Sequence, residues 1–585
     1  MENWVLKNKK ADFQTIMKEC GVSEVIARCL VNKGFETVED MSLFLKPGLE
    51  QLSEPFLLRD LPKACNILKN KMEEGKRIRI IGDYDVDGVV ATYVLYQTFT
   101  RLGARIDYEI PDRIKDGYGI NINMVEAAFK DGIDTIITCD NGIAALEQIE
   151  KAKSYGITVI VTDHHSLVQS EEGEAILPIA DAVINPKRPD CEYPFKGLCG
   201  AAVAYKLSVA LLKEFELSGS QEFAEELLSY VAIATVCDVM ELIGENRVIV
   251  KHGLELLKQT KNRGLNALMD LCSVDKEQLS TFHLGFVIGP CLNASGRLDT
   301  AKKGLELLLS DNDEAAVHLA GEVKSLNELR KNMTAENVEK AIAIIEESDI
   351  KNHKVLVVHL CDCHESIAGI IAGRLRERYH RPAIVLTDAE HGVKGSGRSI
   401  EAYDMFEELS RCRDLFLKMG GHPMAAGLSL TPENVENLRT TLNQNTLLTE
   451  EMLVPKVTID IHLPLGFINE QLVNELKLLE PFGKGNEKPL FAEKDLKIRS
   501  AFIIGKNGNG LRLRVQNKYG REMDAVYFGD INEFFAYISR TYGEEEARKM
   551  KTGRGVNATI SVTYFPKINE YNGFKNLQLM IQNYR

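Results

Sequence analysis

Acidic and histidine side chains follow three short runs that are rich in β-branched residues. The runs are residues 77–81, 134–138 and 157–161, and each is typical of a buried strand. The polar residues that follow the three runs are Asp83, Asp85, Asp87, Asp140, Asp163, His164 and His165. Because ligands bind at the carboxyl ends of strands in an open parallel sheet, we expect these side chains to meet at one edge. Asp238, which follows the helical run 227–236, is a further candidate.

Carboxylate oxygens with one or two imidazoles suit Mn²⁺ or Mg²⁺ better than zinc, which prefers cysteine and histidine. Several carboxylates at one edge would repel one another without cations. Two metal ions about 3.5–4 Å apart can share a carboxylate and promote in-line displacement at phosphorus. The pattern therefore predicts hydrolysis of a phosphoester or phosphoanhydride.

Other interpretations of these residues are weaker. A calcium-binding loop that starts at Asp83 needs glutamate at its twelfth position, where the chain has Val94. A single aspartate after a strand is usually a turn or helix cap, which is the simpler interpretation of Asp140 or Asp238 taken alone. The four residues 361–364, Cys-Asp-Cys-His, could bind a soft metal, but no second pair accompanies them, so we do not expect a metal there.

The elements that must position these residues follow from the hydrophobic pattern. Residues 1–50 indicate short helices, and residues 77–265 alternate strands with helices, which is typical of a parallel sheet. Residues 301–349 predict a long helix or helix pair, and a second α/β region follows, with strands near 354–360 and 383–386 and a helix near 367–379. From about residue 455, strand-like segments such as 511–515 and 559–564 predict a small all-β module.

Composition places the chain among globular proteins and excludes a disordered or fibrous class. It has 585 residues, 44% of them hydrophobic and 27% charged, with a net charge of −14. The first ten residues lack the apolar segment of a secretory signal, no run predicts a membrane span, and twelve scattered cysteines favour a reducing, cytoplasmic location.

The net charge alone argues against nucleic acid as a partner, but its distribution reverses that argument. Residues 493–585 carry 16 Lys and Arg against 10 Asp and Glu, a net charge of +6, whereas residues 1–492 carry −20. Aromatic residues such as Tyr519, Phe528 and Tyr564 are interleaved with these bases. Basic residues that follow a phosphate backbone and aromatic faces that stack on bases are typical of single-strand-binding modules. Many of these aromatics should nevertheless belong to the core of a small barrel.

Taken together, the four acidic motifs resemble those of the DHH phosphoesterase family, and more specifically its RecJ branch. The resemblance covers nearly the whole chain. Further segments that carry it are 111–113, 117–119, 293–297, 394–399, 420–427 and 481–486. The three letters Asp-His-His are a weak signal alone, but the ordered set is specific. One departure is Cys363-His364-Glu365-Ser366, where RecJ proteins often have a Trp-His-Pro-Gly-like stretch.

The resemblance implies an α/β fold of several domains. They are an N-terminal helical segment (1–50), a DHH domain with a parallel sheet (51–300), a helical connector (301–350), a smaller DHH-associated α/β domain (351–450) and a C-terminal OB-fold β-barrel (455–585).

The resemblance also implies a two-metal site that uses Mn²⁺ or Mg²⁺. Asp83 and Asp85 would hold one ion. Asp87, His164 and Asp238 would hold the other, Asp140 would bridge them, and His165 would lie near the scissile phosphate. Asp163 joins His165 and Asp140 as a catalytic candidate. The candidates for substrate binding are Arg297, Ser396, Arg398, Gly420, Gly421, His422, Arg512 and Arg514.

The activity that the resemblance implies is a single-stranded-DNA-specific 5′→3′ exonuclease that releases 5′ mononucleotides in DNA recombination and repair. A DHH phosphodiesterase of short RNA or cyclic dinucleotides is the alternative. Single-strand-binding protein and a RecQ-like helicase are the candidate protein partners, since such a nuclease acts on unwound ends.

Overall fold

The computed structural model describes residues 2–170, 173–390, 392–505, 508–552, 557–571 and 573–585. The chain divides into two compact units. One is Leu49–Pro455, and the other joins Met1–Gly48 to Lys456–Arg585. Among helices in the described residues, none is long and apolar enough to span a membrane. All twelve cysteines are free thiols.

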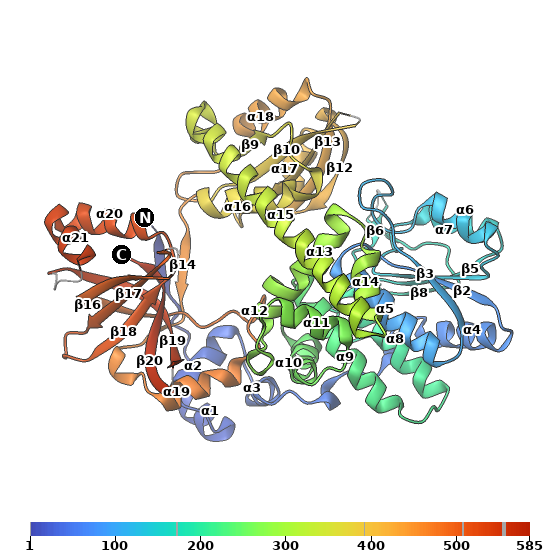
Figure 1. Ribbon diagram of the computed structural model, residues 1–585, viewed down its shortest axis with the longest axis horizontal. Helices are drawn as coiled ribbons and strands as arrows, with labels where there is room; N and C mark the ends of the chain where they lie inside the picture. Colours follow the sequence, from blue (N-terminus) through green and yellow to red (C-terminus); the bar gives the residue numbers. More distant parts are fainter. Residues whose placement is uncertain (1, 171–172, 391, 506–507, 553–556, 572) are drawn as a thin grey trace. The chain divides into compact units, whose positions relative to one another are not determined.

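The larger unit begins with a five-stranded parallel sheet in the order β3-β2-β4-β5-β8. Its strands are β2 (Arg77–Ile81), β3 (Arg105–Glu109), β4 (Thr135–Cys139), β5 (Thr158–Thr162) and β8 (Ala182–Ile184). Helices α6 (Ile122–Lys130) and α7 (Leu146–Ser154) cover one face (Figure 1). Helices α4 (Leu61–Glu73), α5 (Val86–Arg101) and α8 (Gly200–Glu214) cover the other. The expectation that the three acidic runs are neighbouring strands is confirmed, with β4 and β5 each shifted by one residue.

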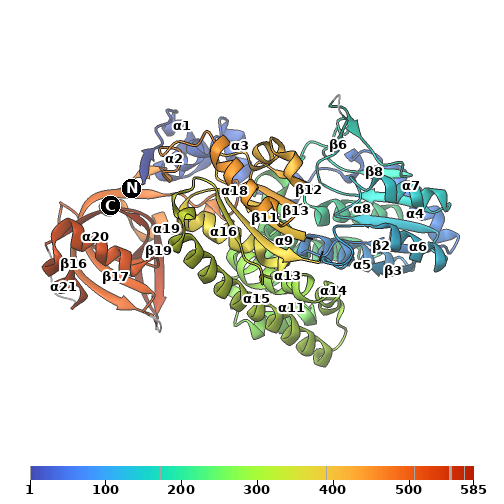
Figure 2. The ribbon, with the colours of Figure 1, turned by 90° about the horizontal axis from the view of Figure 1, so that it is seen from above.

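A helical region follows the parallel sheet. It comprises α9 (Ser220–Cys237), α10 (Gly244–Lys258), α11 (Arg263–Leu271), α12 (Thr281–His283), α13 (Gly289–Leu298), α14 (Lys302–Leu309) and α15 (Asp313–Glu347). The predicted long helix is α15, which has 35 residues. It contacts α11, α13 and α14 as well as α16 (Ala368–Tyr379) and the strand β9 (Leu356–His359), so it connects the two α/β regions (Figure 2).

The second α/β region has a mixed sheet in the order β12-β13-β11-β10-β9. Its further strands are β10 (Ala383–Ala389), β11 (Gly392–Arg398), β12 (Phe416–His422) and β13 (Ala425–Leu430), and α17 (Met405–Ser410) and α18 (Asn434–Asn445) complete it. Only β9 and β10 pair in parallel within it; the other described pairings are antiparallel. Two short strands, β6 (Val168–Gln169) and β7 (Ala175–Ile176), pair separately.

The second unit is a β-barrel closed by β16, which pairs with both β17 and β19. Its sheet comprises β15 (Ile461–His462), β16 (Phe491–Ile504), β17 (Gly510–Gln516), β18 (Glu522–Tyr527), β19 (Thr559–Tyr571) and β20 (Phe574–Tyr584), while β14 (Lys456–Ile459) belongs to a separate two-stranded sheet. The N-terminal strand β1 (Asn3–Leu6) pairs in parallel with β14. Helices α1 (Phe13–Cys20), α2 (Glu24–Lys33) and α3 (Val38–Leu45) share the barrel's hydrophobic core.

Two expectations about this unit are wrong. The N-terminal segment is not helical alone, since it contributes β1. The C-terminal module is not all-β, because it carries α19 (Glu470–Leu476), α20 (Ile531–Tyr542) and α21 (Glu544–Lys551). Phe534 and Ile538 are spaced four residues apart on one face of α20, and both are buried in the barrel core. This helical spacing lies between two strongly β-like segments, which obscured it.

Candidate active site

The strands β2, β4 and β5 end at one edge of the sheet, and their following loops turn sharply there. Asp85 caps α5, because its Oδ1 accepts hydrogen bonds from the backbone N–H groups of Asp87 (2.9 Å) and Gly88 (3.1 Å). Asp140 has a φ of 60°, a left-handed conformation that is uncommon outside glycine and that clusters at functional sites. The local backbone therefore directs several carboxylates to one place.

The acidic and histidine side chains form three overlapping groups in which the potential ligand atoms lie within 4.8 Å of one another. His164 is central, since its Nε2 lies 3.1 Å from Asp140 Oδ1, 3.6 Å from Asp87 Oδ2 and 3.7 Å from Asp238 Oδ2. The groups are Asp83, Asp85 and Asp140; Asp87, His164 and Asp238; and Asp140, His164 and His165. Asp140 and His164 each belong to two of these groups.

The electrostatics of these carboxylates fit a pair of divalent cations. Burial, and then the charge of neighbouring aspartates, raises the pKa of Asp83 to about 8 and the pKa of Asp238 to about 8. The same two causes raise the pKa of Asp140 well above its usual range. Asp83 Oδ2, Asp140 Oδ1 and both ring nitrogens of His164 are buried without a hydrogen-bond partner. Buried acceptors without partners are costly, and oxygen-rich groups of this kind suit Mg²⁺ or Mn²⁺.

Asp87 is held by the start of helix α8. Its two carboxylate oxygens accept hydrogen bonds from the backbone N–H groups of Gly200 (2.6 Å) and Ala201 (2.8 Å). The partial positive charge of a helix N-terminus stabilises such a carboxylate. A Cβ on Gly200 would lie 2.5 Å from Asp140 Oδ1, so only glycine allows α8 to approach both aspartates.

Asp163, like Asp87, has hydrogen-bond partners on both oxygens, but it belongs to none of the three groups of potential ligands. Oδ2 accepts from the Ile143 N–H (2.9 Å), and Oδ1 accepts from two backbone N–H groups and lies 2.8 Å from His165 Nδ1. Burial alone would raise the pKa of Asp163, but the hydrogen bond and charge of His165 lower it overall. Burial opposes protonation of His165, yet Asp163 raises the pKa of His165 to about 9. Asp163 therefore orients His165 and favours its cationic form.

Two residues near the acidic groups were missed as site candidates. The Tyr118 hydroxyl donates to the backbone carbonyl of Asp140 (2.6 Å) and lies 3.2 Å from the ring nitrogens of His165. The Arg113 guanidinium lies 4.1 Å from the ring centroid of Tyr84. Both residues fall in the segments 111–113 and 117–119 that support the family resemblance, which is the signal that could have identified them.

Arginine side chains from several elements gather beside the acidic groups. Arg297, on α13, donates through Nη1 to the Ser366 carbonyl at 2.7 Å. Burial, then the charges of Arg113 and Arg330, lower its pKa to about 9. Arg398 hydrogen-bonds Ser396 Oγ (3.0 Å). The lowered pKa means that these cations lack enough nearby negative charge, so the group favours an anion such as phosphate.

The other candidates for substrate binding are more exposed. Gly420, Gly421 and His422 lie at the end of the edge strand β12 with accessible surfaces. In the barrel, Arg512 and Arg514 both form ion pairs with Asp524, at 2.8 Å and 2.9 Å. Their charge is therefore partly neutralised, which the count of basic residues did not indicate.

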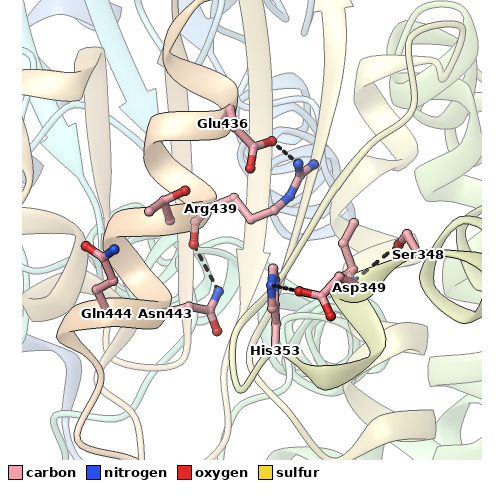
Figure 3. Close-up of a pocket in the computed structure, with 9 residues that line it drawn as sticks. Ser348, Asp349, His353, Glu436, Arg439, Asn443 and Gln444 are labelled. Carbon is pink, nitrogen blue, oxygen red and sulfur yellow. Dashed lines mark hydrogen bonds and ion pairs between the residues drawn. The ribbon is translucent and has the colours of Figure 1, made fainter.

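An open cavity of about 530 Å³ lies elsewhere in the second α/β region (Figure 3). Its charged side chains pair among themselves, Arg439 with Glu436 and His353 with Asp349. None of the nine residues that line it is a predicted site residue. The acidic edge of the parallel sheet therefore remains the candidate active site.

Comparison with known domains agrees with this division of the chain. The N-terminal domain of the DHH family matches residues 77–235, the DHHA1 domain matches 352–446, and the RecJ OB domain matches 459–583. Fold and site together define a DHH-type phosphoesterase.

Curated relatives identify the branch of this class. The chain is 35% identical to the single-stranded-DNA-specific exonuclease RecJ of Bacillus subtilis, covering 99% of this chain and 70% of the relative. It is 33% identical to the RecJ of Escherichia coli, covering 96% and 95%. The crystal structure of RecJ with Mn²⁺ from Thermus thermophilus matches with a TM-score of 0.81 and 26% identity, covering all of this chain and 79% of that one. A second structure of that protein contains Mg²⁺ and matches with a TM-score of 0.76. The chain belongs to the RecJ family.

Proposed function

We propose that the protein is a single-stranded-DNA-specific exonuclease that uses Mn²⁺ or Mg²⁺ to hydrolyse phosphodiester bonds. The observation that carries this proposal is the buried, partnerless set of acceptors around Asp140 and His164, placed beside a group of arginines in a RecJ-family chain. The direction, 5′ to 3′, and the release of 5′ mononucleotides follow from the family resemblance. DNA recombination and repair are the processes that this activity serves, and a cytoplasmic location suits the free thiols.

We assign two cation positions to the acidic edge. Asp83 and Asp85 would hold one ion, and Asp87, His164 and Asp238 would hold the other. Asp140, whose Oδ1 lies 3.1 Å from His164 Nε2, would be shared. When bound, two such ions stabilise the negative charge that develops on the phosphate oxygens and lower the pKa of water.

The protein's own residues position the strand and the proton donors. Asp163 holds His165 as a cation beside Asp140, where it can donate a hydrogen bond to a phosphate oxygen or a leaving oxygen. Arg297, with Arg398 and Ser396, grips a phosphate next to the acidic edge, since guanidinium groups recognise phosphate through two parallel hydrogen bonds.

We assign the binding of longer strands to the barrel unit. Its basic residues would contact phosphates, with Arg512 and Arg514 exchanging Asp524 for the DNA backbone. Proteins that unwind or coat single strands, such as a RecQ-like helicase and single-strand-binding protein, are the partners that this function implies.

Digestion of single strands labelled at either end tests the proposal. We expect metal-dependent release of labelled mononucleotide from the 5′ end with Mn²⁺ or Mg²⁺, no reaction after chelation, and little reaction with blunt duplex. An Asp140→Asn variant should lose cleavage but still bind single strands. Digestion from the 3′ end would contradict the polarity, and a preference for cyclic or dinucleotide substrates would contradict the substrate class.

A further inference from the structure

A second cluster of metal-ligating side chains lies in the mixed sheet, separate from the acidic edge. His359, Cys361 and Asp388 offer an imidazole nitrogen, a thiol sulfur and a carboxylate oxygen that lie within 4.8 Å of one another. His359 Nε2 is 2.8 Å from Asp388 Oδ1. The sequence instead groups Cys361 with its chain neighbours Asp362, Cys363 and His364. There Cys363 is buried and donates to the His364 carbonyl, while His364 Nδ1 lies 2.7 Å from Ser366 Oγ, so those two side chains have other partners.

The cluster lies at the end of the parallel strand pair β9–β10. His359 pairs in register with Leu386, and Asp388 follows Leu386 by two residues, so both side chains continue the sheet face that Val357 and Leu386 bury. The loop after β9 is fixed by a hydrogen bond from the Leu360 N–H to the Leu386 carbonyl (2.8 Å). Cys361 is therefore held beside the other two ligands by the fold.

A surface ion pair explains only part of this arrangement. The His359 and Asp388 side chains are 24% and 57% exposed, and such pairs contribute little to stability. The pair also does not account for Cys361, which is the one exposed cysteine among the twelve, all of which lie in the described residues. An exposed thiol that faces an imidazole and a carboxylate is instead a donor set for a borderline metal ion.

We propose that His359, Cys361 and Asp388 bind Zn²⁺ or a similar borderline divalent cation, with a fourth position open to water. Zinc bonds of about 2.0–2.3 Å place tetrahedral ligand atoms about 3.3–3.8 Å apart, so small side-chain rotations suffice to form the site. The acidic edge differs, since its donors are oxygens and imidazole. Of the two thiols that precede its aspartates, Cys139 is buried, and Cys237 is partly buried and donates to the Leu284 carbonyl at 3.5 Å.

Cobalt substitution tests the proposal, because only a thiolate ligand gives an intense sulfur-to-Co²⁺ charge-transfer band in the near ultraviolet. We would titrate Co²⁺ into the metal-free full-length protein. We expect one such band per chain, displaced by Zn²⁺, retained in Asp140→Asn and in Cys20→Ser, and lost in Cys361→Ser. No band in the unaltered protein, or a band that survives in Cys361→Ser, would overturn the proposal.

A second measurement does not depend on the absorption band of cobalt. Zn²⁺ should slow alkylation of Cys361 by at least tenfold, read by peptide mass spectrometry, and Asp388→Asn should remove most of that protection. Equal alkylation rates with and without Zn²⁺ would also overturn the proposal. Cys361→Ser should retain Mn²⁺-dependent nuclease activity, because Cys361 is not among the ligands assigned at the acidic edge.

Discussion

Individual aspartates of the active site have different tasks, although the sequence presents them as one acidic group. Asp83 and Asp140 each keep a buried oxygen without a hydrogen-bond partner, which a cation could satisfy. Asp163 has no such oxygen, because three backbone N–H groups and His165 occupy both of its oxygens. Sequence spacing could place these residues at one edge of the sheet. It could not separate ligand from support, because that depends on which side chains lie close enough together to share a cation, and Asp163 is not among them.

Replacing Asp163 with asparagine tests this separation. The new amide NH₂ is a donor, so it would face another donor at one of the two positions, either the Ile143 N–H or the N–H groups that now bind Oδ1. His165 also loses the negative charge that keeps it protonated. We expect kcat to fall by about 10–100-fold, the usual cost of removing such a supporting partner, with nearly unchanged binding of Mn²⁺ and single strands. Steady-state kinetics and Mn²⁺ titration would measure this. Loss of Mn²⁺ binding would instead mean that Asp163 is a ligand.

Removing the Arg297 side chain tests the proposed phosphate-binding site. An Arg297→Ala change deletes a partly buried cation close to Arg113 and Arg398. Hydrogen bonds to charged groups contribute about 1.5–3 kcal/mol, so KM for single strands should rise by about 10–100-fold. Arg374→Ala is the control, because Arg374 is an exposed residue paired with Glu377. An unchanged KM in the first variant would place the phosphate elsewhere.

Helix α8 acts on the site as an element, through its N-terminus. Gly200 and Ala201 donate to Asp87, and the absence of a side chain at Gly200 leaves space for Asp140. The hydrophobic pattern predicted strands β2, β4 and β5 well, because each is short and strongly apolar. It gave no indication that α8 starts against the aspartates, since this contact spans more than a hundred residues of sequence. Helices α20 and α21 were missed for a related reason, because they cover a barrel whose strands dominate the local pattern.

A methyl group at Gly200 should therefore damage the site without unfolding the protein. In Gly200→Ala the new Cβ would lie 2.5 Å from Asp140, which must move away from the shared ligand position. We expect activity to fall by about 100-fold, the usual cost of displacing a catalytic group by about 1 Å. Gly321→Ala in α15 is the matched control: nothing lies near its Cβ, and it should stabilise the helix by about 1 kcal/mol with full activity. Wild-type activity in Gly200→Ala would show that α8 does not constrain Asp140.

At the scale of the whole molecule, the two ends of the chain belong to one folding unit. Residues from α2 and α3, including Ile26, Leu30 and Met41, are buried in the same core as the barrel strands. Asn583 donates to Glu2 at 2.8 Å. The positive charge that offsets the acidic remainder of the chain also lies in this unit. Sequence reasoning placed the first 50 residues in a segment of their own, because long-range pairing such as β1 with β14 leaves no local signature.

This organisation determines which truncations should fold. A fragment of residues 49–455 retains every residue assigned to the cation sites and to phosphate binding. Its hydrophobic cores contain no residue of the barrel. We expect it to hydrolyse very short single strands at a rate near that of the full chain but to bind long strands at least tenfold more weakly, with a smaller dependence of affinity on salt, because the basic barrel is absent. A fragment of residues 1–455 leaves Ile26, Leu30 and Met41 without their barrel partners, so it should aggregate. Circular dichroism, light scattering and binding at several salt concentrations would compare the two. Equal losses on short and long strands in the 49–455 fragment would contradict the division between a hydrolytic unit and a strand-binding unit.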